Sequence, residues 1–334
     1  MLGESTTPLA EVHDLVMLDL DGVVYVSGTA IEGVPERLDR LVASGVHVAF
    51  VTNNASRPAA TVADNLVRLG VRASATDVVT SAQAAARVLV DRLGPGSRVL
   101  VLGGSGLVSA LEELGLVPET DPESSEVTAI VTGYGPDVLW KHVMRAAVRI
   151  RDGLPWVASN TDMSIPTAYG LAPGHGVLVK TLADFSGVRP TVAGKPSPPL
   201  LEETIRRVGG DRPLMVGDRL DTDIEGARAV GVDSLLVMTG VTGLAELAAA
   251  TPRLRPTYVA ATTEGLFTAH GAPQHEDGRT LLGGWEAGVT DGRLGVEGAG
   301  SPDDWWRVVA VAAWSHLDFS GTPADTSSLT VPGA

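Results

Sequence analysis

A chain of 334 residues with a net charge of −15 and 44% hydrophobic residues is too long for one average domain and has the composition of a soluble globular protein. The acidic balance leaves no basic stripe for a phosphate backbone, so we expect no nucleic-acid partner, while small anions remain possible through local positive charge or a bound cation. The absence of cysteine excludes disulfides, thiolate catalysis and cysteine-ligated metals. The N-terminal segment has no basic start or apolar core, and no apolar run nears the ~20 residues of a membrane span, so we expect a cytoplasmic protein without membrane insertion.

Short apolar runs alternate with helix-like segments through most of the chain. Two segments, 33–45 and 57–71, have helical spacing of their apolar residues and are closed by glycines. Continuous apolar runs linked by helical crossovers are typical of a doubly wound parallel sheet of the α/β class. The expected strands are 15–20, 46–54, 97–104, 127–135, 213–218 and 233–240.

The composition changes near residue 268. Residues 268–279 are polar and unperiodic and predict a linker, and strand-like runs around Asp291-Gly292 then predict a hairpin. Residues 301–318 predict a helix, with Ser301 as N-cap and Pro302 in the first turn. The last stretch, from residue 320, predicts disorder. We interpret the tail as a small αβ extension, half of an acetyltransferase-like fold or a dimerisation patch, with its tryptophans as local core.

Two aspartates, Asp19 and Asp21, stand at the end of the first apolar run, before Gly22. Like charges this close are tolerated only with a cation or a shared proton, and an oxygen-only ligand set suits Mg²⁺. The plainer alternative is an acidic turn that caps the next segment.

Three further segments place polar side chains at strand ends or before a helix, where ligands of open α/β sheets bind. Thr52 and Asn53 end the next strand and offer a hydroxyl and amide hydrogens to phosphoryl oxygens. Lys195 stands between a glycine and a proline before a helix, as a point charge for phosphate. Asp218 directly follows an apolar strand, with Asp223 close behind. Taken alone, these are equally a polar turn, a surface lysine and a helix cap.

Together the segments "DLDG", "VTNN", "GKPSP" and "GDRLDTDI", in this order, resemble the four motifs of the haloacid dehalogenase (HAD) superfamily of phosphatases. The last two are similar to those of the subfamily that contains NagD and the nitrophenyl-phosphate phosphatases. The resemblance covers about residues 12–266. In its core and its extra C-terminal segment the chain is most similar to the actinobacterial glycerol 3-phosphate phosphatases.

The resemblance implies roles for the acidic residues. Asp19 is then the nucleophile that forms an aspartyl-phosphate, and Asp21 is the general acid and then the general base. Mg²⁺ is held by Asp19, by Asp21 through its backbone carbonyl, and by Asp218. Gly22 and Asp223 support this site.

The same resemblance implies that Thr52, Asn53 and Lys195 bind the transferring phosphoryl group. The chain between Thr52 and Lys195 is too long for a loop, and the family places a C2 cap domain there. We therefore expect a HAD-like core at 1–81 and 191–267, a cap at 82–190 and the linker with the extension at 268–334. In the loop at 159–176, the candidates for contacts to the leaving group are Asn160, Asp162, Met163, Ser164 and His175.

The function implied is Mg²⁺-dependent hydrolysis of a small phosphorylated metabolite, best glycerol 3-phosphate in glycerophospholipid metabolism, by a protein that relatives suggest forms a homodimer. Alternatives are a phosphatase for phosphoglycolate, nucleotides or sugar phosphates, and a phosphotransferase with the same site. A response-regulator receiver domain also joins acids, a threonine and a lysine. Its acidic pair precedes the phosphorylated aspartate, however, which is not the order seen here.

Overall fold

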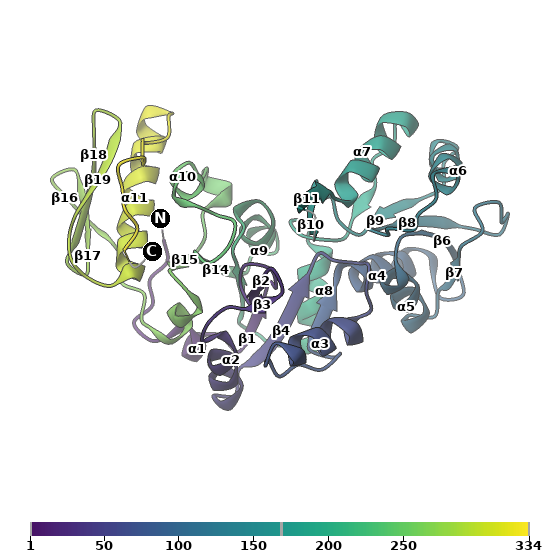
Figure 1. Ribbon diagram of the computed structural model, residues 1–334, viewed down its shortest axis with the longest axis horizontal. Coiled ribbons are helices and arrows are strands. Elements are labelled where there is room, and N and C mark those ends of the chain that lie inside the picture. Colours follow the sequence, from purple (N-terminus) through teal and green to yellow (C-terminus); the bar gives the residue numbers. More distant parts are fainter. Residues whose placement is uncertain (1, 168–169, 333–334) are drawn as a thin grey trace. The chain divides into compact units, whose positions relative to one another are not determined.

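The computed structural model describes residues 2–167 and 170–332 and divides into two compact units. The first comprises residues Met1–Val48 and Gly210–Ala334, and the second comprises Ala49–Gly209 (Figure 1). The expected boundaries of core, cap and extension remain a prediction. No helix within the described ranges is both long and apolar enough to cross a membrane.

The first unit is built on a parallel sheet of four neighbouring strands. In order these are β15 (Tyr258–Ala260), β14 (Asp233–Val237), β13 (Pro213–Gly217) and β1 (Leu15–Leu18). Every side chain of β1 is fully buried, as the continuous apolar run predicts for a strand covered on both faces. The strands expected at 15–20, 213–218 and 233–240 are thereby confirmed.

The extension is a second sheet covered by a helix. Strands β16 (Gln274–Glu276), β17 (Arg279–Leu282), β18 (Trp285–Thr290) and β19 (Arg293–Gly298) form an antiparallel meander. Helix α11 (Pro302–Ser320) packs against β17 and β18 on one side and against β15 on the other (Figure 1). The small αβ extension is thereby confirmed.

Local sequence signals predict the hairpin turn and the helix start of this extension. Asp291 and Gly292 both have positive φ, 50° and 76°, which matches the turn that the Asp-Gly pair predicts. The Ser301 hydroxyl accepts a hydrogen bond from the Asp304 amide at 3.1 Å, which confirms the expected N-cap. Trp305 and Trp306 pack edge to face at 4.9 Å inside the local core, as expected.

Two expectations about the tail are wrong. The expected linker at 268–279 contains strand β16 and the fully covered His270, so it is part of the fold. The stretch expected to be disordered is packed: Ala324 is buried, and backbone hydrogen bonds join Asp325 to the β18–β19 hairpin. Composition suggested disorder because few residues of this stretch are apolar, but those few cover the tryptophan core.

The second unit contains a five-stranded parallel sheet. Its order is β12-β9-β8-β6-β7, and the strands expected at 97–104 and 127–135 correspond to β6 (Arg98–Leu102) and β8 (Ala129–Thr132). The two outer strands are β12 (Thr191–Val192) and β7 (Val117–Glu119), and β9 (Trp156–Ala158) lies between β12 and β8. Strand β4 (His47–Thr52) leads from the first unit into the second, where it pairs in parallel with β5 (Val78–Thr80).

Helices complete both units. The two helices expected from spacing are α2 (Val34–Ala43) and α3 (Ala59–Arg68). The remaining long helices of the second unit are α4 (Ser81–Leu93), α5 (Ser105–Glu113), α6 (Trp140–Arg151), α7 (His175–Ser186) and α8 (Pro199–Val208).

The segment 159–176, expected to be a loop, contains a hairpin of β10 (Ser164–Thr167) and β11 (Gly170–Pro173). Residues 168 and 169 of this segment lie outside the described residues.

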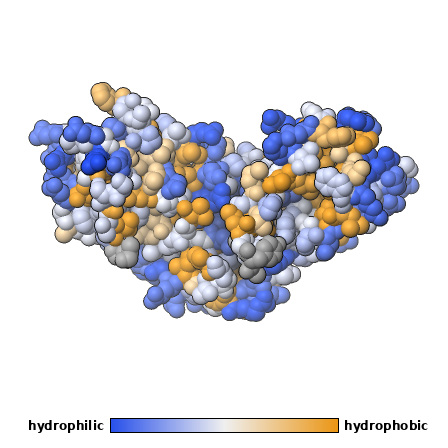
Figure 2. All heavy atoms as spheres, turned by 45° about the horizontal axis from the view of Figure 1, so that its top comes forward, coloured by the Kyte–Doolittle hydropathy of each residue, from blue (hydrophilic) through white to orange (hydrophobic). Residues whose placement is uncertain are grey.

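Large apolar side chains remain exposed at several places, including Trp140 and Met144 of α6. Figure 2 shows apolar residues in small groups among hydrophilic ones on one face of the molecule. Such scattered exposure is ordinary for globular proteins and identifies no interface by itself.

Candidate active site

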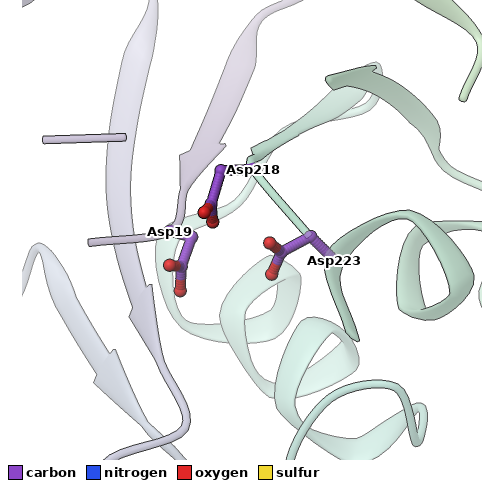
Figure 3. A group of neighbouring side chains, drawn as sticks. All are labelled: Asp19, Asp218 and Asp223. Carbon is purple, nitrogen blue, oxygen red and sulfur yellow. The ribbon is translucent and has the colours of Figure 1, made fainter. Parts of the chain in front are cut away.

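Three carboxylates of the first unit come together: Asp19, Asp218 and Asp223 (Figure 3). One oxygen from each lies within 4.8 Å of the others. Asp19 directly follows β1 and Asp218 directly follows the neighbouring strand β13, so parallel pairing brings them to one sheet edge. Asp223 comes from η1 (Leu220–Ile224), a π-helical turn just beyond β13.

Two glycines leave space for the Asp218 carboxylate. Gly22 has a φ of +86°, and a Cβ there or at Gly240 would overlap the Asp218 carboxylate. The same carboxylate accepts a hydrogen bond from the Val241 amide at 2.6 Å. The Thr239 hydroxyl donates to the Gly22 carbonyl at 2.6 Å, which joins the two glycine turns. The residues after β14 thus build the site although that strand end carries no charged side chain.

The three carboxylates fit a hard divalent cation. Asp218 is fully buried and Asp223 is 1% exposed, so the repulsion between these groups is poorly screened by water. An all-oxygen set suits Mg²⁺, which is usually bound by a few carboxylates together with water. The resemblance implied only a supporting role for Asp223, whereas the structure places its carboxylate in the cluster. The part expected for the Asp21 carbonyl remains a prediction.

Asp21 sits on a tight turn after β1, with its side chain exposed. The Gly22 amide donates to the Tyr25 carbonyl at 2.8 Å, and the Tyr25 hydroxyl donates to the Asp21 carboxylate at 3.4 Å. A carboxylate held at such a turn but open to solvent is suited to proton transfer.

The polar residues expected to bind phosphate lie in the second unit. Thr52 ends β4, and its hydroxyl oxygen accepts a hydrogen bond from the Asn54 amide at 3.1 Å. Lys195 is 2% exposed, and its ammonium group lies 3.4 Å from the Val51 carbonyl. Asn53, the residue after Thr52, donates from its side chain to the Lys195 carbonyl and accepts from the Lys195 amide. All three residues therefore belong to one unit, and hydrogen bonds join Asn53 to Lys195.

The candidates for leaving-group contacts differ in burial: two are buried, two are exposed, and Asp162 is half-buried. Met163 and Ser164 are exposed at the start of the β10–β11 hairpin. Asn160 is buried, and its side-chain amide donates to the Asn53 carbonyl at 2.8 Å. Asp162 accepts from the Asn53 side chain at 3.2 Å. His175 is buried at the start of α7, with Nδ1 2.9 Å from the Asn160 carbonyl.

Burial lowers the pKa of His175 to about 4, although its hydrogen bond with Asn160 acts in the other direction. The imidazole is therefore neutral at pH 7 and holds the Asn160 backbone rather than carrying charge. The expected roles of all five candidates remain predictions, as does the convergence of the Asp19 cluster with Thr52 and Lys195. Sequence reasoning missed the supporting role of Gly240, for which the "MTG" strand end was the available signal.

Comparison with known proteins agrees with this geometry. The family model described as haloacid dehalogenase-like hydrolase matches residues 16–117, and a second HAD-hydrolase-like model matches residues 192–266. D-glycerol 3-phosphate phosphatase from Mycobacterium tuberculosis is 39% identical over 319 residues, which cover 92% of this chain and 87% of the relative. Acid sugar phosphatase from Staphylococcus aureus is 35% identical over 244 residues, which cover 72% of this chain and 92% of the relative.

Solved structures give the same relationship. The crystal structure of glycerol phosphate phosphatase from M. tuberculosis in complex with magnesium matches with a TM-score of 0.84 and 39% identity, over 93% of each chain. A thermostable NPPase from Geobacillus stearothermophilus matches with a TM-score of 0.67 and 30% identity, over 74% of this chain and 95% of that one. The chain therefore belongs to the haloacid dehalogenase-like hydrolases, with the HAD-like α/β fold. Within them it is a phosphatase, and its structural neighbours include NagD-like and NPPase-like proteins.

Proposed function

We propose that this phosphatase is a Mg²⁺-dependent phosphomonoester hydrolase that acts on glycerol 3-phosphate through an aspartyl-phosphate. The observation that carries the proposal is the cluster of Asp19, Asp218 and Asp223 at the ends of two parallel strands. A cluster of this kind suits a divalent cation beside a nucleophilic carboxylate. The magnesium complex of the M. tuberculosis relative supports the choice of Mg²⁺.

Coverage of the relatives supports glycerol 3-phosphate as the substrate. The glycerol 3-phosphate phosphatase matches 92% of this chain, so the similarity reaches into the extension. The acid sugar phosphatase matches 72%. Sugar phosphates are therefore the second candidate, and the expected location in the cytoplasm, the link to glycerophospholipid metabolism and a homodimer remain further proposals.

The proposed first step transfers the phosphoryl group to the enzyme. A carboxylate oxygen of Asp19 forms a bond to phosphorus while the bond from phosphorus to the glycerol oxygen breaks. Asp21, in its protonated form, gives its proton to that leaving oxygen, and glycerol departs. Its exposed position at the Tyr25 turn allows access to both the leaving group and water.

The second step returns Asp19 to its starting state. Asp21 now takes a proton from water, whose oxygen bonds to phosphorus as the bond to Asp19 breaks, and inorganic phosphate leaves. Lys195 and Thr52 hold the phosphoryl oxygens through charge and a hydroxyl hydrogen bond. Mg²⁺, held by Asp19, Asp218 and Asp223, would offset the negative charge that phosphate brings to these acids.

The test is phosphate release from glycerol 3-phosphate, sugar phosphates, phosphoglycolate and nucleotide monophosphates, compared by kcat/KM. We expect glycerol 3-phosphate to rank first, and both EDTA and Asp19→Asn to abolish release. Asp221→Asn is the matched control, because Asp221 is exposed and paired with Arg219 at 2.9 Å. Acid quench and mass spectrometry should find a phosphoryl group on Asp19. Release that survives Asp19→Asn would overturn the mechanism, and a higher kcat/KM for a sugar phosphate would overturn the substrate.

A further inference from the structure

The side chain of Asn53 is fully engaged by neighbours within the second unit. Its Oδ1 accepts a hydrogen bond from the Lys195 amide at 2.8 Å. Its Nδ2 donates to the Lys195 carbonyl at 3.0 Å and to a carboxylate oxygen of Asp162 at 3.2 Å. A primary amide has two N–H donors, so these two acceptors use both of them. The side chain thus has no N–H left for a phosphoryl oxygen.

The orientation of this amide is fixed by its partners. With the amide reversed, its oxygen would face the Lys195 carbonyl and the Asp162 carboxylate, and its nitrogen would face a backbone N–H. Each of those contacts would set like against like, so the network selects one orientation. Gly194 permits the close approach, because a Cβ there would lie 2.7 Å from the Asn53 side-chain oxygen.

The backbone of Asn53 is held as well. Its carbonyl accepts hydrogen bonds from the Ser81 hydroxyl at 2.5 Å and from the Asn160 side chain at 2.8 Å. Asn160 in turn accepts from the Asp162 amide at 3.1 Å. One residue at the end of β4 is therefore tied both to the peptide units on each side of Lys195, 142 positions along the chain, and to the segment 160–162.

We propose that Asn53 is a positioning residue that fixes Lys195 for phosphate binding and couples it to Asp162. This role rests on the proposed phosphatase function and replaces the direct phosphate contact that the sequence suggests for Asn53. A lysine carries its charge on a flexible four-carbon stem, so its placement depends on a fixed backbone. The Asn53 side-chain amide donates one hydrogen bond and accepts another, and these two bonds fix the peptide groups on both sides of Lys195.

The first test compares Asn53→Ala with Lys195→Ala by kcat/KM for phosphate release. Misplacement of a reacting or binding group by about 1 Å costs roughly a hundredfold, and we expect a loss of that order for Asn53→Ala. Because Asn53 acts through Lys195, adding Asn53→Ala to Lys195→Ala should cost less than about threefold more. Full additivity would overturn the proposal. Asn54→Ala is the matched control, since the Asn54 side chain bonds only to Ser56 among the contacts described.

The second test exchanges the polarity of the pair. Asn53→Asp places a carboxylate against Asp162 and should lose activity at least as strongly as Asn53→Ala. Asp162→Asn supplies a new amide donor to that carboxylate, so the double variant should regain roughly tenfold in kcat/KM over Asn53→Asp. A purely structural role predicts no such rescue, and its absence in folded protein would refute the coupling.

The third test needs no activity and so separates this proposal from the proposed function. Hydrogen exchange of the Lys195 amide, which donates to Asn53, should accelerate in Asn53→Ala and stay unchanged in Asn54→Ala. If wild-type protein and Lys195→Ala release phosphate equally, the proposed role of Lys195 fails while this measurement still decides the positioning role. Unchanged exchange in Asn53→Ala would overturn that role.

Discussion

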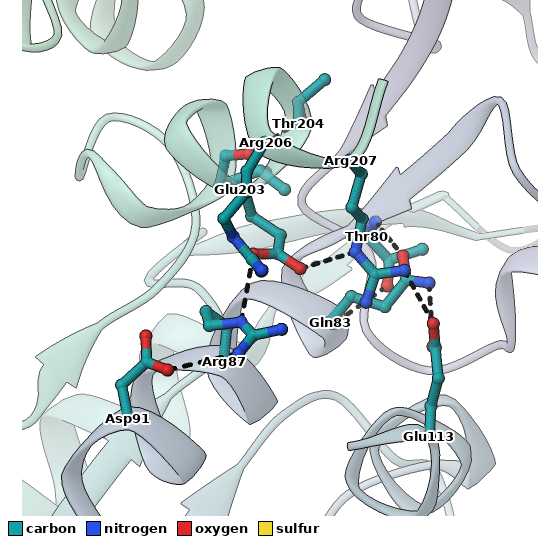
Figure 4. A network of polar contacts seen from close by, with 10 residues as sticks. Thr80, Gln83, Arg87, Asp91, Glu113, Glu203, Thr204, Arg206 and Arg207 are labelled. Atoms are coloured by element: carbon teal, nitrogen blue, oxygen red, sulfur yellow. Dashed lines mark hydrogen bonds and ion pairs between the residues drawn. The ribbon is translucent and has the colours of Figure 1, made fainter. Parts of the chain in front are cut away.

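Removing the Glu203 carboxylate should destabilise the second unit, because this buried group is the shared partner of three arginines. The Glu203 side chain is fully buried on α8 and meets three arginines (Figure 4). Arg207 donates to it at 2.5 Å, Arg206 pairs with its other oxygen, and Arg87 of α4 lies 3.5 Å away. Burial, followed by the neighbouring Arg87 and Arg207, lowers the pKa of Arg206. The glutamate therefore holds together three like charges from two helices.

The expected magnitude follows from the loss of one buried partner. Breaking a buried ion pair by removing one member costs about 3–5 kcal/mol. The arginine side chains are 22–48% exposed, so water replaces part of the lost interaction and the lower end of that range applies. We expect Glu203→Ala to cost about 3 kcal/mol, which is a fall in Tm of roughly 6–12 °C for a unit of this size.

Scanning calorimetry measures this change, because separate units can melt in separate transitions. Glu202→Ala is the matched control on the same helix: Glu202 is exposed, and its removal should alter stability by less than about 0.5 kcal/mol. Salt should reduce the Glu203 effect little, since buried pairs are weakly screened. A Tm for Glu203→Ala within 1 °C of the Tm of Glu202→Ala, measured under the same conditions, would refute the reasoning.

Three further predictions concern the first unit. Gly22→Ala places a Cβ against Asp218 at a positive φ, so the stabilisation by Mg²⁺ seen in Tm should disappear; an unchanged Mg²⁺ titration would contradict this. Asp223→Asn should weaken Mg²⁺ affinity by roughly 10–100-fold in calorimetric titration. Equal affinity in this variant and the wild-type protein would show that Asp223 does not contribute to Mg²⁺ binding. Burial and then Arg307 lower the pKa of His270 to about 4 from 6.5, so the unfolded chain takes up the proton first. The contribution of the neutral His270 to the free energy of unfolding is therefore fully present above pH 6.5, and up to about 3 kcal/mol of it is lost towards pH 4. His270→Phe should flatten this dependence of Tm on pH.

The strands of the first unit were predictable because burial on both faces leaves a simple pattern. β1 and β13 are continuous apolar runs that end in Asp19 and Asp218, so their type and their ends are both visible in the sequence. Asp223 is different, because its carboxylate joins the cluster through a π-helical turn. No residue spacing signals that turn, so only a supporting role for Asp223 could be expected, from the resemblance to the HAD motifs.

Long-range hydrogen bonds explain most of what sequence reasoning missed in the second unit. The position of Asn53 at a strand end was visible, but its partners are Lys195 and Asp162, far along the chain. The sequence predicts a loop rather than a hairpin within 159–176, because proline and glycine interrupt the alternation that signals a strand. In both cases the deciding contacts are set by tertiary structure rather than by neighbours in sequence.

The extension is best understood as a continuation of the first unit rather than an added module. The Arg307 side chain donates to the Val259 carbonyl of β15, and the Trp314 indole donates to the Leu247 carbonyl at 2.7 Å. Both tryptophan and leucine belong to one buried cluster that spans the parallel sheet and α11. Removing residues 268–334 would expose that cluster to water, at a cost of roughly 25 cal/mol for each Å² of apolar surface. A loss of activity after such a truncation would therefore report damage to the sheet that holds Asp19 and Asp218, and would not by itself indicate regulation by the extension.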